Sequence, residues 1–443
     1  MIRFIIILGL CFIYMVYEIA PSEELESIFL LFCLIAYLLV FPQLNRKGKI
    51  LTGFLFIVGL LLHFAQGSRG FALLEGFNQN MALLSIMILA PLISIPLKQE
   101  GIIASVVSKL HEQKNNDRNT FYGVSSFMMF LAPILNMGAL RIVHSLVANL
   151  KIPSRLLSNS YYGGFTPAFI WSPFFASVGI VLYMMDLPYL SYMLVGIIFA
   201  LLQILIGFLV LRPNQNGPVD NQQMEMSHSG EKRNFIILLV FIITLLTTLI
   251  LEESITHQPM LLLVSINCLF VPIVWAVVRQ NWSGLKEEII VFKERVSTKS
   301  SMEIGLFLTA GLFGNALVQT PIVDVLEKAI IWSSEGSIIL LFFFLIAFIT
   351  MMAAMGIHQI IVVPIVISIL VSSVDVNPYT IAFMCIFAWM MSASISPINP
   401  LNVVISQCVG KNGVTVALRW NGKYFLAITG VAFVYVYLLN LVG

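Results

Sequence analysis

Long runs of apolar residues, separated by short polar segments, make up most of the chain. A membrane-spanning helix needs about 20 apolar residues. Eleven stretches reach that length: residues 3–20, 27–43, 49–66, 81–97, 155–185, 187–211, 234–251, 258–279, 303–331, 377–409 and 414–441. Two further stretches, 119–150 and 336–372, are too long for one crossing and are interrupted near their middle. The pattern predicts about eleven transmembrane helices plus two re-entrant hairpins.

The composition places the chain among membrane proteins. Of its 443 residues, 59% are hydrophobic and only 10% are charged, whereas soluble domains contain about 25% charged residues. The sequence contains no nucleotide-binding loop, zinc-protease helix or hydrolase elbow, so no enzymatic activity, metal, cofactor or nucleic-acid partner is expected. We expect an all-α polytopic membrane protein, with the lipid bilayer as its surroundings.

The distribution of basic residues predicts the topology. With a cytoplasmic amino terminus, the loops on the same side are 44–50, 98–118, 151–155, 212–233, 279–300 and 410–423. Together with the amino terminus they contain 21 of the 24 Lys and Arg residues, all except Arg69, Lys328 and Arg141. Cytoplasmic loops carry an excess of positive charge. We therefore predict a multi-pass protein of the plasma membrane, with its carboxyl terminus outside. Charged and apolar residues alternate at 281–299. This pattern predicts either a helix at the membrane interface or an ordinary helix in a cytoplasmic loop.

The two halves of the chain resemble each other at an offset of about 220 residues. Met137-Gly138 aligns with Met355-Gly356, and Pro173 aligns with Pro400. The resulting division is an extra helix in 1–26, a first repeat in 27–211, a linker in 212–233 and a second repeat in 234–443. Each repeat contains five crossings and one hairpin, and an odd number of crossings inverts the second repeat.

Each repeat also contains a helix that proline residues interrupt within the membrane. The first lies in 155–185, with Pro167 and Pro173, and the second in 377–409, with Pro397 and Pro400. Irregular backbone at that depth is tolerated only where it is buried in protein or lines a wet cavity. Paired interruptions of this kind are typical of secondary transporters, whose substrate sites lie between them.

This arrangement resembles the divalent anion/sodium symporter family of the ion transporter superfamily over residues 27–443. That family has hairpins with Ser-Asn-Thr tips and broken helices with a Thr-Pro-Pro-Asn-like turn. The corresponding segments here are Asn136-Met137-Gly138, Met355-Gly356-Ile357, Ser172-Pro173-Phe174-Phe175 and Asn399-Pro400-Leu401-Asn402. Neither tip keeps Ser-Asn-Thr. The resemblance implies ion-coupled anion transport, with Na⁺ or H⁺ as the coupling ion, and a possible homodimer.

Arg141 carries the strongest single signal for function. A charge in the centre of a membrane costs about 2.5–3.5 kcal/mol, so we expect Arg141 to face the protein interior and to contact an anion. The alternative is that it bonds backbone carbonyls or snorkels along its hairpin towards the membrane surface. His358, at the matching tip, could exchange a proton or bond the hairpin backbone as a neutral ring.

The remaining candidate residues are polar groups near the tips and the breaks. The predicted substrate contacts are Arg141, Asn136, Gly138, Thr166, Ser172, His358, Gln359, Ser394, Ser396, Asn399 and Asn402. The predicted contacts to the coupling ion are His358, Asn136, Asn315, Asn399 and Asn402. For Asn315, simple packing beside Gly311 and Gly314 is the alternative.

Together these features predict a secondary active transporter of a small organic anion of the carboxylate type. It would work by alternating access, through movement of a hairpin-containing domain. A cation/proton antiporter of the same superfamily is one alternative, although such antiporters usually require a carboxylate within the membrane. A membrane scaffold protein that does not transport is the other.

Overall fold

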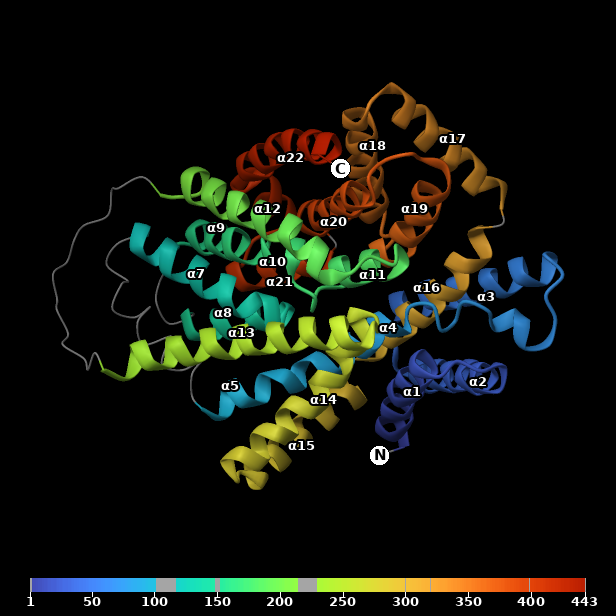
Figure 1. The fold of residues 1–443 in the computed structure, drawn as a ribbon, viewed down its shortest axis with the longest axis horizontal. Coiled ribbons are helices and arrows are strands. Elements are labelled where there is room, and N and C mark those ends of the chain that lie inside the picture. The colour runs from blue at the N-terminus through green and yellow to red at the C-terminus, as the bar shows by residue number, and fades with distance from the viewer. Residues whose placement is uncertain are drawn as a thin grey trace. The chain divides into compact units, whose positions relative to one another are not determined.

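The computed structural model describes residues 2–100, 117–147, 152–213, 229–298, 300–318, 320–397 and 399–442, and within them every regular element is a helix (Figure 1). In this described part of the chain, eleven segments are long and apolar enough to cross a membrane: Ile2–Ile19, Glu23–Gln43, Arg46–Ala65, Met81–Gln99, Ser154–Met184, Tyr189–Val210, Ile236–Thr256, Met260–Arg279, Ser301–Val318, Pro378–Val409 and Gly422–Leu441. Each corresponds to one predicted stretch. The all-α polytopic class is therefore confirmed.

The chain forms two compact units, and each draws on both predicted repeats. Unit 1 comprises Met1–Ile95, Thr256–Trp332 and Ile360–Val374. Its helices are α1 (Ile2–Ile19), α2 (Glu23–Val40), α3 (Arg46–Ala65), α4 (Met81–Leu89), α14 (Met260–Arg279), α15 (Trp282–Thr298), α16 (Ser301–Val318), α17 (Pro321–Gly336) and α19 (Gln359–Ser373), with 3-10 turns η1 (Phe41–Gln43), η2 (Gly70–Leu74) and η3 (Ala90–Ser94). Residues 282–298 are thus helical, as predicted for most of the segment 281–299.

Unit 2 comprises Pro96–Ile255, Ser333–Gln359 and Asp375–Gly443. Its helices are α7 (Asp117–Leu135), α8 (Met137–Val147), α9 (Ser154–Phe165), α10 (Ala168–Trp171), α11 (Ala176–Met184), α12 (Tyr189–Val210), α13 (Ser229–Thr256), α18 (Ile338–Ala354), α20 (Pro378–Ile395), α21 (Pro400–Val409), the π-helix η4 (Thr415–Trp420) and α22 (Gly422–Val442). The short α5 (Ile95–Gln99) lies at the boundary of the two units.

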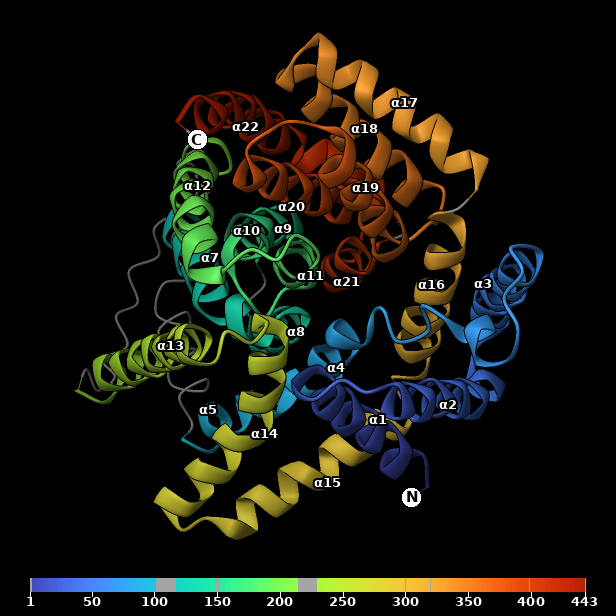
Figure 2. The same cartoon turned by 45° about the vertical axis from the view of Figure 1, so that its right-hand side comes forward.

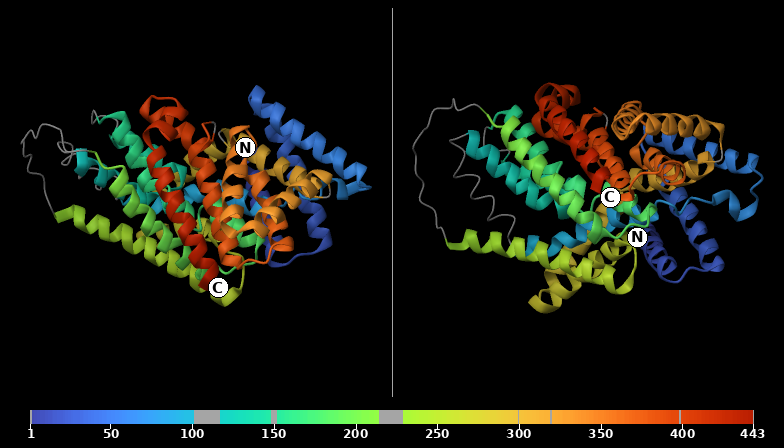
Figure 3. Two further views of the ribbon diagram at one scale, coloured as in Figure 1. Left: turned by 90° about the horizontal axis from the view of Figure 1, so that it is seen from above. Right: turned by 45° about the horizontal axis from the view of Figure 1, so that its top comes forward.

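Within unit 2, two groups of helices pack together. In the first, α12 lies beside α9 and α10 (Figure 2). In the second, α18, α20 and α22, coloured orange to red, lie side by side (Figure 3). The contacts of α10 and α12 with α20 join these two groups.

Unit 1 is organised around α16, which packs along α3. Gly76 (φ +84°) crosses α16 at Gly311, and a Cβ atom at Gly311 would collide with the Gly76 carbonyl oxygen. Asn80 donates a hydrogen bond from Nδ2 to the carbonyl of Phe307, one turn earlier on α16 (3.2 Å). The absence of a side chain at Gly311 thus lets the backbone approach closely, as the sequence suggested for this glycine.

Both long hairpin stretches are interrupted near the middle, as predicted. The first is divided at Asn136, a left-handed residue with φ 49°, into α7 and α8, which pack against each other. The second is divided at residues 355–358, where Gly356 has φ 94°, into α18 and α19. The stretch 303–331 is not one helix: it splits into α16 and α17, because Pro321 has no backbone N–H and begins a new helix.

Candidate functional site

The first broken helix satisfies its own freed backbone groups. Between α10 and α11, three successive carbonyls at the end of α10 receive no bond from a backbone amide. Three hydroxyl groups donate instead: Ser177 to the carbonyl of Phe169 (2.8 Å), Tyr192 to that of Ile170 (3.0 Å) and Tyr189 to that of Trp171 (2.9 Å). The break is therefore a defined feature enclosed by protein, as irregular backbone within a membrane requires.

The first hairpin is hydrogen-bonded to this break. The amide of Met137 donates to its neighbour Asn136 at Oδ1 (2.7 Å) instead of continuing the helix, which leaves the carbonyl of Pro133 free. The Ser172 hydroxyl donates to that carbonyl (2.6 Å). Asn136 Nδ2 donates in turn to the carbonyl of Phe174 (3.3 Å). Two bonds thus join the hairpin tip to the turn between α10 and α11.

The second break makes the corresponding contact. Between α20 and α21, the Ser396 hydroxyl donates to the carbonyl of Ala353, near the end of α18 (3.0 Å). Asn402 Nδ2 donates to the carbonyls of Ser396 and Gly413, at 3.2 Å each. The helix α18, the first half of the second interrupted stretch, is therefore also fixed to its broken helix through a serine hydroxyl and a backbone carbonyl.

These two serines identify equivalent positions in the halves of the chain. Each precedes a proline, in Ser172-Pro173 and Ser396-Pro397, and each bonds a carbonyl just before its hairpin tip. The hydrogen bonds therefore favour pairing Pro173 with Pro397 over the alignment of Pro173 with Pro400. Pro400 occupies the first position of α21, where a missing N–H is tolerated.

Gln359 links the second hairpin to both sides of the second break. Its side chain is 1% exposed. Nε2 donates to the Ser392 hydroxyl on α20 (2.8 Å), and Oε1 accepts from Asn399 Nδ2 (3.1 Å). Asn399 Oδ1 also caps α21 by accepting from the amide of Leu401 (3.2 Å). His358, the preceding residue, is partly buried.

A buried polar cluster connects the first broken helix to α12 and α22. Thr166 donates to the carbonyl of Tyr162 (2.8 Å) and accepts from Gln203 Nε2 (2.8 Å), and the Tyr424 hydroxyl lies 2.9 Å from its Oγ1. Because Thr166 has a single hydroxyl proton, Tyr424 must donate in the last contact. Of these residues, only Thr166 is predicted from the sequence, although Gln203 is the one amide side chain in the apolar helix α12.

Arg141 occupies a different environment from the one expected. It lies on α8, one helical turn beyond Asn136, and its side chain is exposed. It makes no hydrogen bond to the described part of the chain, so the alternative of bonding the hairpin backbone has no support. The helix α8 that carries it packs against α21 of the second broken helix. Its side chain is therefore exposed on the surface of unit 2.

The remaining predicted residues are distributed as follows. Asn315 lies in unit 1, where it packs against Gly76, whereas the other predicted site residues lie in unit 2. Gly138 follows the first tip on α8, and Pro167 separates α9 from α10. Ser394 is fully buried, and its hydroxyl has no hydrogen-bond partner among the residues that the structure describes. Among the described residues no group of three or more His, Cys, Asp or Glu could hold a metal ion.

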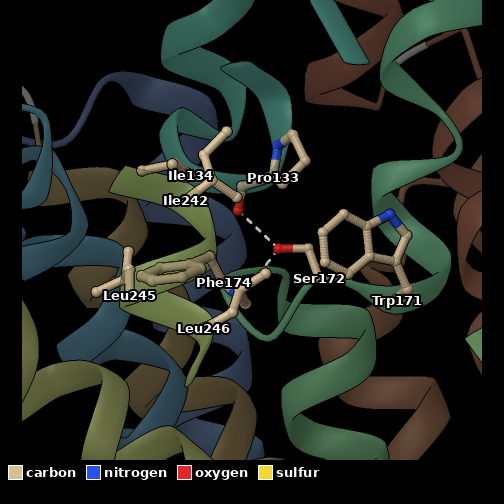
Figure 4. A pocket seen from close by; sticks show the side chains of 8 residues that line it. All are labelled: Pro133, Ile134, Trp171, Ser172, Phe174, Ile242, Leu245 and Leu246. Atoms are coloured by element: carbon tan, nitrogen blue, oxygen red, sulfur yellow. Dashed lines mark hydrogen bonds between the residues drawn. The ribbon is translucent and has the colours of Figure 1, made fainter. Parts of the chain in front are cut away.

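A small pocket lies between the first hairpin, the first break and α13 (Figure 4). Its lining residues are Pro133, Ile134, Trp171, Ser172, Phe174, Ile242, Leu245 and Leu246. The lining is almost entirely apolar, and the Ser172 hydroxyl, which faces Pro133 in Figure 4, is already bonded to its carbonyl. The pocket has no room for a water molecule, so it holds no substrate in this conformation.

Comparison with known proteins shows similarity in fold but not in sequence family. No protein-family model matches the chain, and no curated protein matches it. The structure of MtrF from Neisseria gonorrhoeae, described as illuminating a class of antimetabolite efflux pumps, is similar with a TM-score of 0.53 and 12% identity. The match covers 89% of this chain and 96% of MtrF. The chain therefore has the fold of a multi-pass membrane protein similar to MtrF.

Proposed function

We propose that the protein is a secondary active transporter that carries a small organic anion across the plasma membrane. The observation that carries this proposal is the pair of matching bonds from Ser172 to Pro133 and from Ser396 to Ala353. Each bond ties a hairpin to the break in a discontinuous helix. In secondary transporters such discontinuous helices form the substrate and ion sites.

The charge of the substrate follows from Arg141. An exposed guanidinium without a hydrogen-bond partner in the described chain can bind a carboxylate through two parallel hydrogen bonds. Its helix α8 packs against α21, so an anion held there would lie near elements of both halves. The partly exposed Asn399 at the second break would contact the uncharged part of the substrate, and the buried Gln359 would hold Asn399 in place.

The direction and coupling of transport are part of the proposal. MtrF is described as belonging to a class of efflux pumps, which supports export as the direction to examine first. Two coupling ions are compatible with the site. His358 could carry a proton, and the oxygen atoms near Asn136, Asn399 and Asn402 could receive Na⁺. In either case, movement of the hairpin-containing helices would expose the site alternately to the two sides.

Transport by the purified protein in liposomes tests the proposal. Radiolabelled small carboxylates would be loaded inside or outside, with sodium and pH gradients imposed separately. We expect saturable movement of at least one carboxylate under one gradient, and loss of it in Arg141→Gln but not in Lys286→Gln, which removes an exposed cation in unit 1.

Two results would favour the alternatives. Sodium-driven proton movement without any organic anion would identify a cation/proton antiporter. Absence of all movement from a folded protein would identify a scaffold protein. For the coupling ion, His358→Gln should abolish the pH dependence of transport while sparing anion exchange, and strong sodium dependence of the wild type would contradict proton coupling.

A further inference from the structure

Three segments of unit 2 that are distant in sequence meet at one end of the unit. Asn159 Nδ2 donates to the carbonyl of Leu211 (3.3 Å). This bond joins the second turn of α9 to the residue that directly follows α12. Asn421 Nδ2 donates to the Ser158 hydroxyl (2.9 Å), which joins the same part of α9 to the junction of η4 and α22. All three segments therefore come within about one helical turn of Ser158 and Asn159.

Each of these segments carries an exposed cation. Arg155 is in the first turn of α9, Arg212 follows Leu211, and Arg419 lies in the π-helix η4. None of the three forms a hydrogen bond with another described residue. The sequence has no Asp or Glu in 137–185, 187–219 or 376–443, which include all three segments. Three exposed arginines thus lie within a few residues of these contacts, and their own segments contain no carboxylate.

The start of α9 adds to this positive charge. Helix N-termini carry a partial positive charge and usually have an acidic or capping side chain. Here Pro153 is the N-cap, without a side-chain cap, and the first turn has no acidic residue. Placing Arg155 there is unfavourable unless an anion neutralises it. The π-helix that carries Arg419 is a rare conformation, frequent at functional sites.

Directly beside these cations, unit 2 exposes apolar surface. Leu205 and Leu209 on α12 and Leu426 on α22 are 55%, 59% and 77% exposed. The two helices touch nearby, where a Cβ atom at Gly207 would meet the Tyr424 ring at 3.5 Å. Trp420, at the end of η4, is of the residue type enriched at membrane interfaces. Cations above an apolar helix pair match the two parts of a phospholipid.

We propose that Arg155, Arg212 and Arg419 form a binding site for the phosphate of an anionic phospholipid, whose acyl chains lie against α12 and α22. Basic pockets between membrane helices bind such headgroups. The site does not depend on the transported substrate. In the predicted topology these residues face the cytoplasm, where anionic lipids attract juxtamembrane cations.

Lipid titration of the full-length protein tests this site. The protein in nanodiscs of phosphatidylcholine would receive increasing fractions of phosphatidylglycerol, and its thermal unfolding temperature would be measured. We expect the wild type to be stabilised, and Arg155→Gln, Arg212→Gln and Arg419→Gln each to weaken the apparent lipid affinity about fivefold, corresponding to about 1 kcal/mol per basic residue. Lys286→Gln is the matched control, because it removes one exposed charge elsewhere.

Two outcomes would overturn the proposal. One is an equal loss in Lys286→Gln, which would indicate a general surface-charge effect. The other is equal protection by inorganic phosphate, which would indicate a site for a soluble anion. Should a variant fail to fold, photo-crosslinking of wild-type protein to a phosphatidylglycerol probe decides the question. Crosslinks within 152–160, 205–213 or 415–426 support the site, and crosslinks confined to other segments contradict it.

Discussion

The phenolic hydroxyl of Tyr162 donates a hydrogen bond of 3.2 Å to the backbone carbonyl of Ser394. Tyr162 belongs to α9 of the first broken helix, and Ser394 lies in the last turn of α20, just before the second break. Both residues are fully buried. This bond connects the two interrupted helices directly, so that the first helix satisfies a backbone group of the second.

Removing this hydroxyl should destabilise the protein. In Tyr162→Phe the buried Ser394 carbonyl loses its donor, and an unsatisfied buried group costs about 1–3 kcal/mol. We expect a lower thermal unfolding temperature of the purified protein, together with slower transport. Tyr437→Phe is the control, because Tyr437 is 50% exposed and should tolerate the change. Equal unfolding temperatures for the two variants would contradict the structural role of Tyr162.

The two serine bonds to the hairpins should have parallel functions. Ser172→Ala and Ser396→Ala each free a hairpin carbonyl, of Pro133 or Ala353, at a cost of about 1 kcal/mol. We expect faster hydrogen exchange of the backbone amides near the corresponding hairpin tip. The control is Ser145→Ala, whose exposed hydroxyl bonds only within α8. Unchanged exchange at both tips would show that the serines do not restrain the hairpins.

Arg141 should affect substrate affinity and leave stability unchanged. Because its side chain is exposed and unbonded in the described chain, Arg141→Gln should keep the wild-type unfolding temperature. Loss of a charge-assisted contact should weaken anion affinity about tenfold to a hundredfold. Arg141→Lys should keep only part of the wild-type anion affinity, because an ammonium group lacks the planar, two-pronged donor geometry of the guanidinium. Lower stability with unchanged affinity would remove Arg141 from the site.

Two adjacent glycines provide a matched test of packing. A Cβ atom at Gly164 would collide with the carbonyl oxygen of Ser125 on α7, whereas one at Gly163 would meet Leu211 Cδ1 at 3.4 Å. Gly164→Ala should therefore lower stability by about 1–3 kcal/mol through overpacking. Gly163→Ala should be neutral or slightly stabilising, since alanine favours the helix. Thermal unfolding distinguishes them, and equal effects would contradict the close contact of α7 and α9.

Membrane topology can be tested by cysteine labelling in intact cells. A membrane-impermeant thiol reagent should label Asp375→Cys from outside and should not label Lys286→Cys. The native cysteines make a suitable background, because Cys11, Cys33, Cys268 and Cys385 are buried and Cys408 is partly buried. Labelling of the Lys286→Cys variant from outside would invert the topology that the basic residues predict.

The apolar pattern predicted the architecture well, because the membrane imposes a minimum length on each crossing. All eleven apolar segments and the interruptions at Asn136 and Gly356 follow from it. The interruption before Pro321 was missed, although the part of the stretch after it contains Asp324, Glu327 and Lys328. The inverted relation of the repeats and the orientation in the membrane stay predictions.

The contacts at the breaks could not be predicted, because they join segments far apart in sequence. Tyr189 and Tyr192 look like ordinary residues of an apolar helix, yet they supply donors to Trp171 and Ile170. The exposure of Arg141 was also beyond prediction. An arginine in an apolar stretch suggests burial, whereas its actual surroundings depend on which face of α8 it occupies.

The three hydroxyl-capped carbonyls of α10 have a consequence for movement. Their donors, Ser177, Tyr192 and Tyr189, belong to α11 and α12. If α10, α11 and α12 move together, the three hydroxyl groups stay hydrogen-bonded to the carbonyls at the break. Its hydration free energy then does not depend on its depth in the membrane, because water is never its hydrogen-bond partner. An elevator-like displacement of this group would incur no dehydration barrier at the break, whereas bending at the break would.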